Sequence, residues 1–202
     1  MRRLSLSCLA LLASAFALTA HASSITITET FTADGSFNGT AFTDQTVTFG
    51  GTGNTSSVSV AGDFAELLTT SNFLQIGSGP TYSFSSPLEA FANGGTNDFA
   101  GFFDTTDLFD IADITNAAFS TYQLKTSLSV SGAGSPSASP LSTTGGSFEI
   151  DTIDSNVTYT AVVAGSSPVP EPSSILLLAT SALGLFGATR RRIELGCTNQ
   201  SF

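Results

Sequence analysis

Carboxylates are the side chains with the clearest capacity for chemistry in the central part of this chain. Residues 23–167 contain neither histidine nor cysteine. This excludes Ser-His-Asp and Cys-His catalysis, histidine-ligated zinc, Cys-x-x-Cys redox centres and disulfide bonds. Glycoside hydrolysis needs two carboxyl groups, about 5 to 9.5 Å apart. The glutamates available for such a pair are Glu29, Glu66, Glu89 and Glu149. Their sequence positions specify no geometry, so a carboxylate-dependent glycoside hydrolase is an alternative and not the leading interpretation.

The densest acidic stretch has an aspartate at every third position: Asp104, Asp107, Asp110 and Asp113. Oxygen ligands suit calcium, but an EF-type loop needs them at alternate positions, with a turn glycine and a terminal glutamate. This stretch does not fit that pattern, so the four aspartates are only weak candidates for a metal site, and we expect no cofactor. A spacing of three among Phe and Ile is more typical of an amphipathic segment with a solvated acidic face.

Charge restricts the partners of this region. Residues 23–167 carry fourteen acidic residues and one basic residue, Lys125, which gives a net charge of −13. Such a surface repels phosphate, so binding to nucleic acid or anionic lipid through charge is excluded. It is typical of a solvated secreted protein, and it attracts divalent cations or basic partners. The region is long enough for one domain with its own core.

Alternation of apolar and polar residues predicts that this region is mainly β. The clearest runs are residues 25–31, 122–130 and 157–163, where apolar side chains alternate with Thr and Ser. Glycine and asparagine pairs, and the glycine-rich residues 50–54, predict turns, and residues 131–140 predict a loop. Helix is predicted at residues 63–68 and 105–122. We expect an antiparallel β-sandwich, with a barrel as the alternative.

The N-terminus has the features of an export signal. Arg2 and Arg3 precede an apolar run, residues 4–18, that is too short to span a membrane comfortably. Ala20 and Ala22 form an A-x-A site for signal peptidase. Residues 1–22 are therefore predicted to be a signal peptide, removed after passage through the export translocon. Residues 23–167 would remain as an extracytoplasmic β domain.

The C-terminus has three consecutive features. The first is a proline-rich motif: Val169, Pro170, Glu171 and Pro172. The second is an uncharged run, residues 172–189. As a helix it would reach about 27 Å, close to the thickness of a hydrocarbon core. The basic cluster that follows acts as a stop-transfer signal because positive charge stays on the cytoplasmic side; it consists of Arg190, Arg191 and Arg192. We expect a transmembrane helix at about residues 173–189 and a short cytoplasmic extension at residues 193–202.

Residues 168–192 resemble the PEP-CTERM sorting signal, in the Pro-Glu-Pro motif, the apolar run and the arginine cluster. The resemblance implies recognition by exosortase, which removes the tail on the far side of the membrane. It also implies transient anchoring in the inner membrane, then release to the cell surface or beyond. Cargo of this family is often associated with exopolysaccharide and biofilm matrix. An ordinary membrane anchor is the alternative for the tail.

The leading expectation is therefore a non-enzymatic, exported surface or extracellular-matrix protein. A carbohydrate- or calcium-binding module is the first alternative, and the hydrolase is the second. Convergence of acidic side chains in a concave site would distinguish among these functions.

Overall fold

The computed structural model describes residues 23–95, 98–106, 108–136, 140–154 and 156–165, and these ranges are built mainly of antiparallel β-strands, as predicted. The predicted signal peptide lies outside them. The strands are β1 (Ser24–Phe37), β2 (Thr40–Asn54), β3 (Ser59–Ala61), β4 (Phe64–Leu68), β5 (Ser71–Ile76), β6 (Thr81–Tyr82), β7 (Leu88–Asn93), β8 (Phe99–Asp104), β9 (Phe109–Thr115), β10 (Leu128–Pro136), β11 (Leu141–Thr143), β12 (Gly146–Ile153) and β13 (Val157–Val163). Two short 3₁₀ helices in the described ranges are η2 (Thr55–Ser57) and η3 (Ala117–Thr121).

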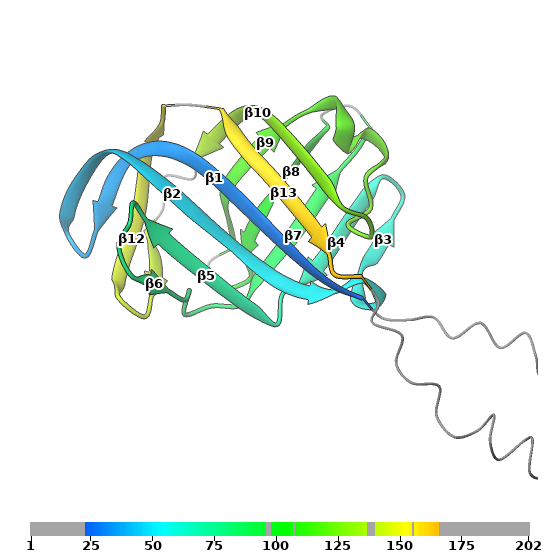
Figure 1. The fold of residues 1–202 in the computed structure, drawn as a ribbon, viewed down its shortest axis with the longest axis horizontal. Helices are drawn as coiled ribbons and strands as arrows, with labels where there is room; N and C mark the ends of the chain where they lie inside the picture. Colours follow the sequence, from blue (N-terminus) through cyan, green and yellow to red (C-terminus); the bar gives the residue numbers. More distant parts are fainter. Residues whose placement is uncertain (1–22, 96–97, 107, 137–139, 155, 166–202) are drawn as a thin grey trace, which may run out of the picture. The chain divides into compact units, whose positions relative to one another are not determined.

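The strands form one sheet that curls into a half-barrel (Figure 1). Its order is β3-β4-β7-β8-β9-β10-β13-β1-β2-β5-β6, with β12 pairing with β1 and β11 with β12. Strand β10 joins the two halves because its first residues pair with β13 and its last residues pair with β9. The sequence predicted a sandwich of two sheets. The structure instead has one continuous sheet whose two halves face each other.

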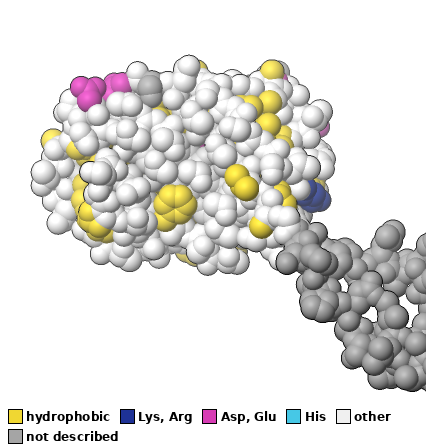
Figure 2. Space-filling model, viewed as in Figure 1, with side chains coloured by type: hydrophobic (Ala, Val, Ile, Leu, Met, Phe, Trp, Pro, Cys, Tyr) yellow, Lys and Arg dark blue, Asp and Glu magenta, His cyan; other side chains and the backbone are white. Residues whose placement is uncertain are grey.

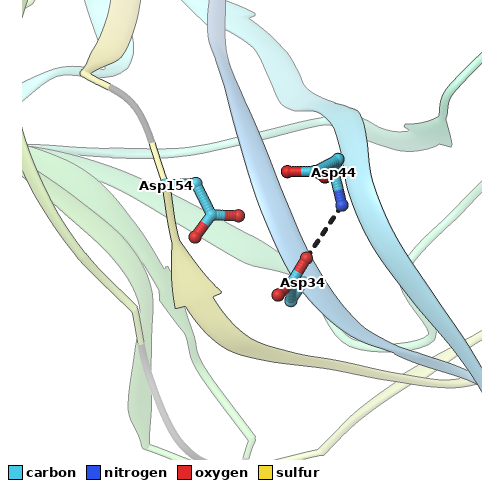
Figure 3. A group of neighbouring side chains, drawn as sticks. All are labelled: Asp34, Asp44 and Asp154. Atoms are coloured by element: carbon cyan, nitrogen blue, oxygen red, sulfur yellow. Dashed lines mark hydrogen bonds between the residues drawn. The ribbon is translucent and has the colours of Figure 1, made fainter.

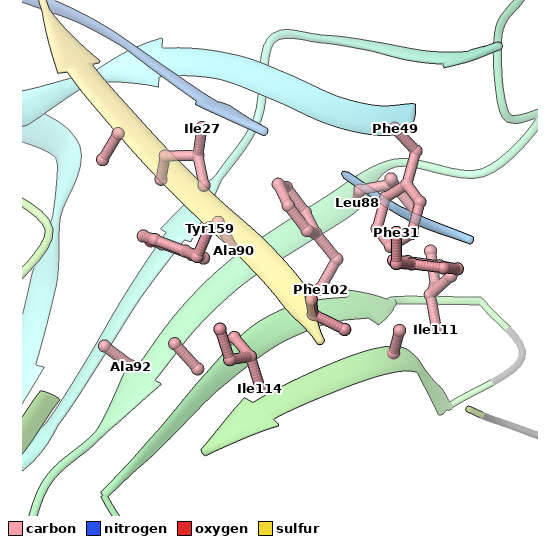
Figure 4. Close-up of a cluster of buried hydrophobic side chains, with 14 of the residues drawn as sticks. Ile27, Phe31, Phe49, Leu88, Ala90, Ala92, Phe102, Ile111, Ile114 and Tyr159 are labelled. Carbon is pink, nitrogen blue, oxygen red and sulfur yellow. The ribbon is translucent and has the colours of Figure 1, made fainter. Parts of the chain in front are cut away.

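The core lies between the inner faces of the curled sheet (Figure 4). On β1, Ile25, Ile27 and Phe31 are buried, while the threonines between them are partly exposed. Phe49 of β2 meets Phe102 of β8 across the core, with ring centroids 5.5 Å apart and planes at 69°. This edge-to-face geometry is favourable for aromatic pairs. The period-two prediction for residues 25–31 and 157–163 is confirmed.

Two glycines of β2 let the opposite half of the sheet approach closely. A Cβ atom on Gly53 would lie 2.8 to 3.0 Å from side-chain atoms of Leu67 on β4. A Cβ atom on Gly51 would lie 2.5 Å from Cγ2 of Thr69, just after β4. Neighbouring Cβ atoms do not approach this closely, so only glycine leaves room for these contacts.

Hydrogen bonds hold the same junction. The amide of Thr70 donates to the carbonyl oxygen of Thr52 on β2 at 2.7 Å. The hydroxyl of Thr69 donates to the carbonyl oxygen of Leu88, the first residue of β7, at 2.7 Å. The connection between β4 and β5 therefore ties β2 to the other half of the sheet.

The prediction of a turn at residues 50–54 is consequently wrong. These residues continue β2, and Gly50, Gly51 and Thr52 pair with β1 on one side and β5 on the other. Glycine is present here to permit close packing, which is a known reason for glycine inside a strand. A single sequence does not distinguish this use from a turn.

The predicted helix at residues 63–68 is also wrong, because Phe64–Leu68 forms β4. Ala65 and Leu67 are buried, whereas Phe64 and Glu66 are partly exposed on the other face. Pairing with β3 and β7 decides the outcome, since a segment of five residues has little helix stability of its own.

Two predictions around β10 are also corrected. The predicted loop at residues 131–140 begins as the second half of β10, and the strand predicted at residues 122–130 starts only at Leu128.

A β-bulge explains why residues 105–122 were wrongly predicted to be helical. The structure has β9 and the short η3 there. Phe102 pairs with Ala112, but Phe103 pairs with Asp110, so β9 carries one extra residue at this point. Asp110 and Asp113 are three positions apart, yet both lie on the outer face of the sheet. The extra residue of the bulge therefore gives two side chains on one face the three-residue spacing that is typical of a helix.

The outer face of β1, β2 and β13 is made largely of threonine. Thr30 lies between Thr48 of β2 and Thr158 of β13, and the hydroxyls of Thr30 and Thr48 are 3.2 Å apart. Figure 2 looks onto this face and shows that charged side chains are few and lie toward its ends. Most of the negative charge of the domain is therefore carried elsewhere.

The contact between Gly53 and Leu67 gives a test of sheet closure. Gly53→Ala should lower the free energy of unfolding by about 1–3 kcal/mol, because the new methyl group overlaps Leu67. Leu67→Ala should cost about 2–5 kcal/mol by leaving a cavity. The double variant should lose clearly less than the sum, since each change makes room for the other. Urea denaturation of the four proteins measures this coupling.

Gly165→Ala is the control, because a Cβ atom at Gly165 has no neighbour within 4 Å. It should leave stability nearly unchanged. Strictly additive losses in the Gly53 and Leu67 series would contradict the proposed close approach of β2 and β4.

Candidate binding groove

An open groove lies on the outer face of β4, β7, β8 and β9. Its volume is about 300 Å³, and its lining combines phenylalanine rings with carboxylates: Phe64, Glu66, Glu89, Phe91, Phe99, Phe103 and Asp110. Small-molecule sites in proteins begin at about this size. The acidic side chains of this sheet therefore do converge in a concave site.

Strand pairing places these side chains together. Glu66 on β4 is directly opposite Phe91 on β7, and Glu89 on β7 is opposite Phe103 on β8. Phe103 is in turn opposite Asp110, next to the bulge of β9. Residues that face each other in an antiparallel pair lie on the same face of the sheet. Acidic and aromatic side chains are consequently neighbours on adjacent strands of the four.

The aromatic part of the groove is built around Phe91. Its ring centroid is 6.1 Å from that of Phe64, with planes at 22°, and 5.6 Å from that of Phe99, with planes at 75°. Gly101 leaves space beside it, because a Cβ atom there would be 3.2 Å from Cζ of Phe91 and 2.6 Å from Oδ1 of Asp113. The missing side chain lets Asp113 approach the aromatic cluster.

Three acids in or beside the groove have raised pKa values: Glu89, Asp110 and Asp113. Burial raises the pKa of Glu89, and the neighbouring Glu66 raises it further through its charge and a side-chain hydrogen bond. Burial also raises the pKa of Asp110. The pKa of Asp113 rises to about 7, through burial and then through the charge of Asp110.

No lysine or arginine is among the described residues that line the groove, and Lys125 is the one basic residue within residues 23–165. The groove thus concentrates negative charge without a compensating cation.

The structure separates the four glutamates that the sequence offered as hydrolase candidates. Glu66 and Glu89 meet in the groove. Glu149 is partly exposed on β12 and is not among the lining residues. Glu29 is fully buried in the core, and neither carboxyl oxygen has a hydrogen-bond partner among the described residues. Burial, and secondarily the charge of Asp113, raises the pKa of Glu29 well above its usual range. Glu29 therefore belongs to the interior and is inaccessible to a ligand in the groove.

The four aspartates proposed as weak metal candidates also separate. Asp110 lines the groove and Asp113 lies beside it. Asp104 is fully buried, and its Oδ1 accepts a hydrogen bond of 2.8 Å from the amide of Thr106. Asp107 lies outside the described residues. Among the described members, the structure brings together Asp110 and Asp113 and not Asp104.

The phenylalanines of the groove were not predicted from the sequence. The signal that could have found them is the period-two pattern in Phe64-Ala65-Glu66 and Glu89-Ala90-Phe91, which puts an aromatic and an acidic residue on one face of each strand. Pairing of the two strands was still needed to bring them into one site.

A second acidic group lies near the end of the β1–β2 hairpin (Figure 3). Carboxylate oxygens of Asp34, Asp44 and Asp154 lie within 4.8 Å of one another, and the amide of Asp44 donates to Oδ1 of Asp34 at 2.8 Å. Carboxylates of this kind could contribute ligands to a hard cation, but calcium takes six to eight oxygens. Asp154 is distant in sequence from Asp34 and Asp44, and the spacing of the three gave no indication of the group.

The comparison with known families concerns the C-terminal end. Residues 168–192 match the PEP-CTERM protein-sorting motif. The chain carries a PEP-CTERM sorting signal. The motif marks an exported protein that is targeted to exosortase and sorted through the membrane to the surface. No curated protein and no solved structure matches the chain.

The residues of the PEP-CTERM signal are outside the part that the structure describes. These are Val169, Pro170, Glu171, Pro172, Arg190, Arg191 and Arg192, together with the expected helix at residues 173–189; the signal-peptidase residues Ala20 and Ala22 are likewise outside it. In the described ranges, no helix has the length and apolar character needed to cross a membrane.

The raised pKa of Asp113 predicts how stability depends on pH. The folded protein keeps this proton up to about pH 7, whereas the unfolded chain loses it near the usual value of 3.8. Stability therefore falls as the pH rises between these values. Asp113→Asn removes this loss, so at pH 8 the variant should be more stable than the parent by about 1–2 kcal/mol, a figure reduced for partial exposure. At pH 3.5 the two proteins should be nearly equal.

Urea denaturation at both pH values tests this prediction. Asp151→Asn is the matched control, because Asp151 is exposed on β12. Its effect should be small at both pH values. If Asp113→Asn were less stable than the parent at pH 8, the ionised carboxylate of Asp113 would not destabilise the folded protein.

Proposed function

We propose that this chain is a non-enzymatic protein of the cell surface or extracellular matrix, and that its β domain binds extracellular polysaccharide. The observation that carries the proposal is the open groove, in which phenylalanine rings and carboxylates occur together on an exported domain. Rings supply apolar surface for sugar C–H groups, and carboxylates accept hydrogen bonds from hydroxyls. The proposed association with biofilm exopolysaccharide follows from this site and from delivery by exosortase.

The geometry of the two groove glutamates favours binding over hydrolysis. Besides burial, the charge of Glu66 and its hydrogen bonding raise the pKa of Glu89, so the two side chains are close neighbours. Glycosidases hold their two carboxyl groups about 5 to 9.5 Å apart, with a sugar carbon or a water between them. This supports a binding role for the pair.

The Pro-Glu-Pro segment gives a test of sorting. Pro170→Ala with Pro172→Ala loosens a conformation that proline keeps extended, and Glu171→Ala removes its charge, while residues 173–189 and the arginines are kept. In a host with the matching exosortase, the triple variant should accumulate uncut in the membrane fraction. The parent should be released in shortened form, as judged by immunoblotting of the fractions.

Ser173→Ala with Ser174→Ala is the control, because it alters adjacent residues and keeps the motif. It should be processed like the parent. Equal processing of the triple variant would mean that the tail acts as an ordinary membrane anchor.

Co-sedimentation tests polysaccharide binding. The processed parent should sediment with extracellular polysaccharide of the producing strain, and Phe99→Ala with Phe103→Ala should lower the bound fraction several-fold, because two groove rings are lost. Reducing-sugar ends are measured in the same samples. Absence of binding would contradict the proposal, and a time-dependent release of reducing ends would assign the groove to a hydrolase.

A further inference from the structure

We infer that the groove on β4, β7, β8 and β9 is specific for a positively charged sugar, namely a hexosamine residue with a free amino group in a polysaccharide. The inference rests on the proposed function and narrows its ligand class. It goes beyond general polysaccharide binding because it requires a cation in the groove.

Charge in and around the groove is the first argument. Three carboxylates line it, from Glu66, Glu89 and Asp110, and Asp113 approaches from beside Gly101. Lys125 is the single basic residue in residues 23–165, and it is not among the lining residues. A neutral sugar would leave these acids repelling one another. An ammonium group bound beside Glu66 and Glu89 would give this neighbouring pair an attractive partner.

The aromatic rings are the second argument. Four phenylalanines line the groove together with the acids, and the negative π faces of such rings attract cations. Phe91 is buried, and Phe64 and Phe99 pack against it with planes at 22° and 75°. The partly exposed rings of Phe64, Phe99 and Phe103 therefore supply the aromatic surface of the groove. Apolar surface beside uncompensated carboxylates suits a ligand that is itself apolar on one side and charged at one point. An amino sugar has this form.

Size and surroundings support a single ring on a flexible polymer. A volume of about 300 Å³ is at the lower limit for small-molecule sites, so it accommodates one ring-sized group and not a folded partner. The acids of the groove are spaced across neighbouring strands, and the outer face of β1, β2 and β13 lacks such a concentration of charge. The groove therefore combines acidic charge with aromatic side chains, whereas the acidic group of Asp34, Asp44 and Asp154 lies apart from it.

The experiment compares oligosaccharides that differ in charge. Glucosamine, N-acetylglucosamine and glucose oligomers of equal length are titrated into the processed, released protein and followed by calorimetry. The glucosamine oligomer should bind at least about tenfold more tightly than the other two, because acetylation removes the cation. A lysine oligopeptide of equal charge is titrated in parallel and should bind at least tenfold more weakly than the glucosamine oligomer.

Two double variants separate the groove from general charge. Glu66→Gln with Glu89→Gln removes two groove carboxylates and should weaken glucosamine binding by at least about tenfold. Glu149→Gln with Asp151→Gln removes the same number of charges from β12 and should leave binding unchanged. Phe103→Leu, which keeps an apolar side chain but removes a ring, should also weaken binding. Melting curves of all variants verify that each is folded.

Each other outcome has a definite meaning. Equal affinity for the acetylated or neutral oligomers would overturn the charged-sugar inference and leave polysaccharide binding intact. Equal losses in the two double variants would assign binding to diffuse charge. Lysine peptide binding as tight as that of glucosamine would assign the groove to a basic protein partner. No binding of any oligosaccharide would contradict both this inference and the proposed function.

Discussion

The close packing of β2 against β4 is the constraint on which the rest of the domain depends. Gly51 and Gly53 leave the space that Thr69 and Leu67 occupy, and this lets the two halves of one sheet meet. Without that approach, Phe49 and Phe102 would not form their edge-to-face contact across the core. A domain without cysteine in residues 23–167 has no disulfide to replace such packing. Its stability must come from burial and from the continuous hydrogen-bonded sheet.

Closure of the sheet gives the domain two outer faces of different chemistry. Threonines cover the face of β1, β2 and β13, where cross-strand hydroxyl pairs such as Thr30 and Thr48 lie 3.2 Å apart. On β4, β7, β8 and β9, acids and phenylalanines occupy equivalent outward positions. Burial of a charge is unfavourable, and it raises the pKa values of Glu89, Asp110 and Asp113; a neighbouring acid raises those of Glu89 and Asp113 further. Such local conflict is common at binding sites, where a ligand relieves it.

The chain combines a sorting signal with a β domain that carries the proposed binding groove. The PEP-CTERM signal at residues 168–192 is a property of local sequence, because a Pro-Glu-Pro motif, an apolar run and a basic cluster are adjacent in the chain. The groove depends on the pairing of strands that are distant in sequence. It extends from β4 (Phe64–Leu68) to β9 (Phe109–Thr115), and β7 and β8 lie between them in the sheet. Substitutions in one part leave the residues of the other unchanged, so sorting and the proposed binding can be tested by separate mutations.

Local patterns in the sequence determined the sorting signal, the acidity of residues 23–167 and the strands at residues 25–31 and 157–163, because each is a property of adjacent residues. The tertiary structure decided the packing role of the glycines in β2 and the position of the aspartates in β9. The glycines at residues 50–54 leave room for Leu67 and Thr69, partners that a local pattern does not reveal. The bulge beside Phe103 puts Asp110 and Asp113 on one face, although their spacing imitates a helix. The groove itself required strand register, because only pairing brings Glu66, Glu89 and the four phenylalanines to the same place.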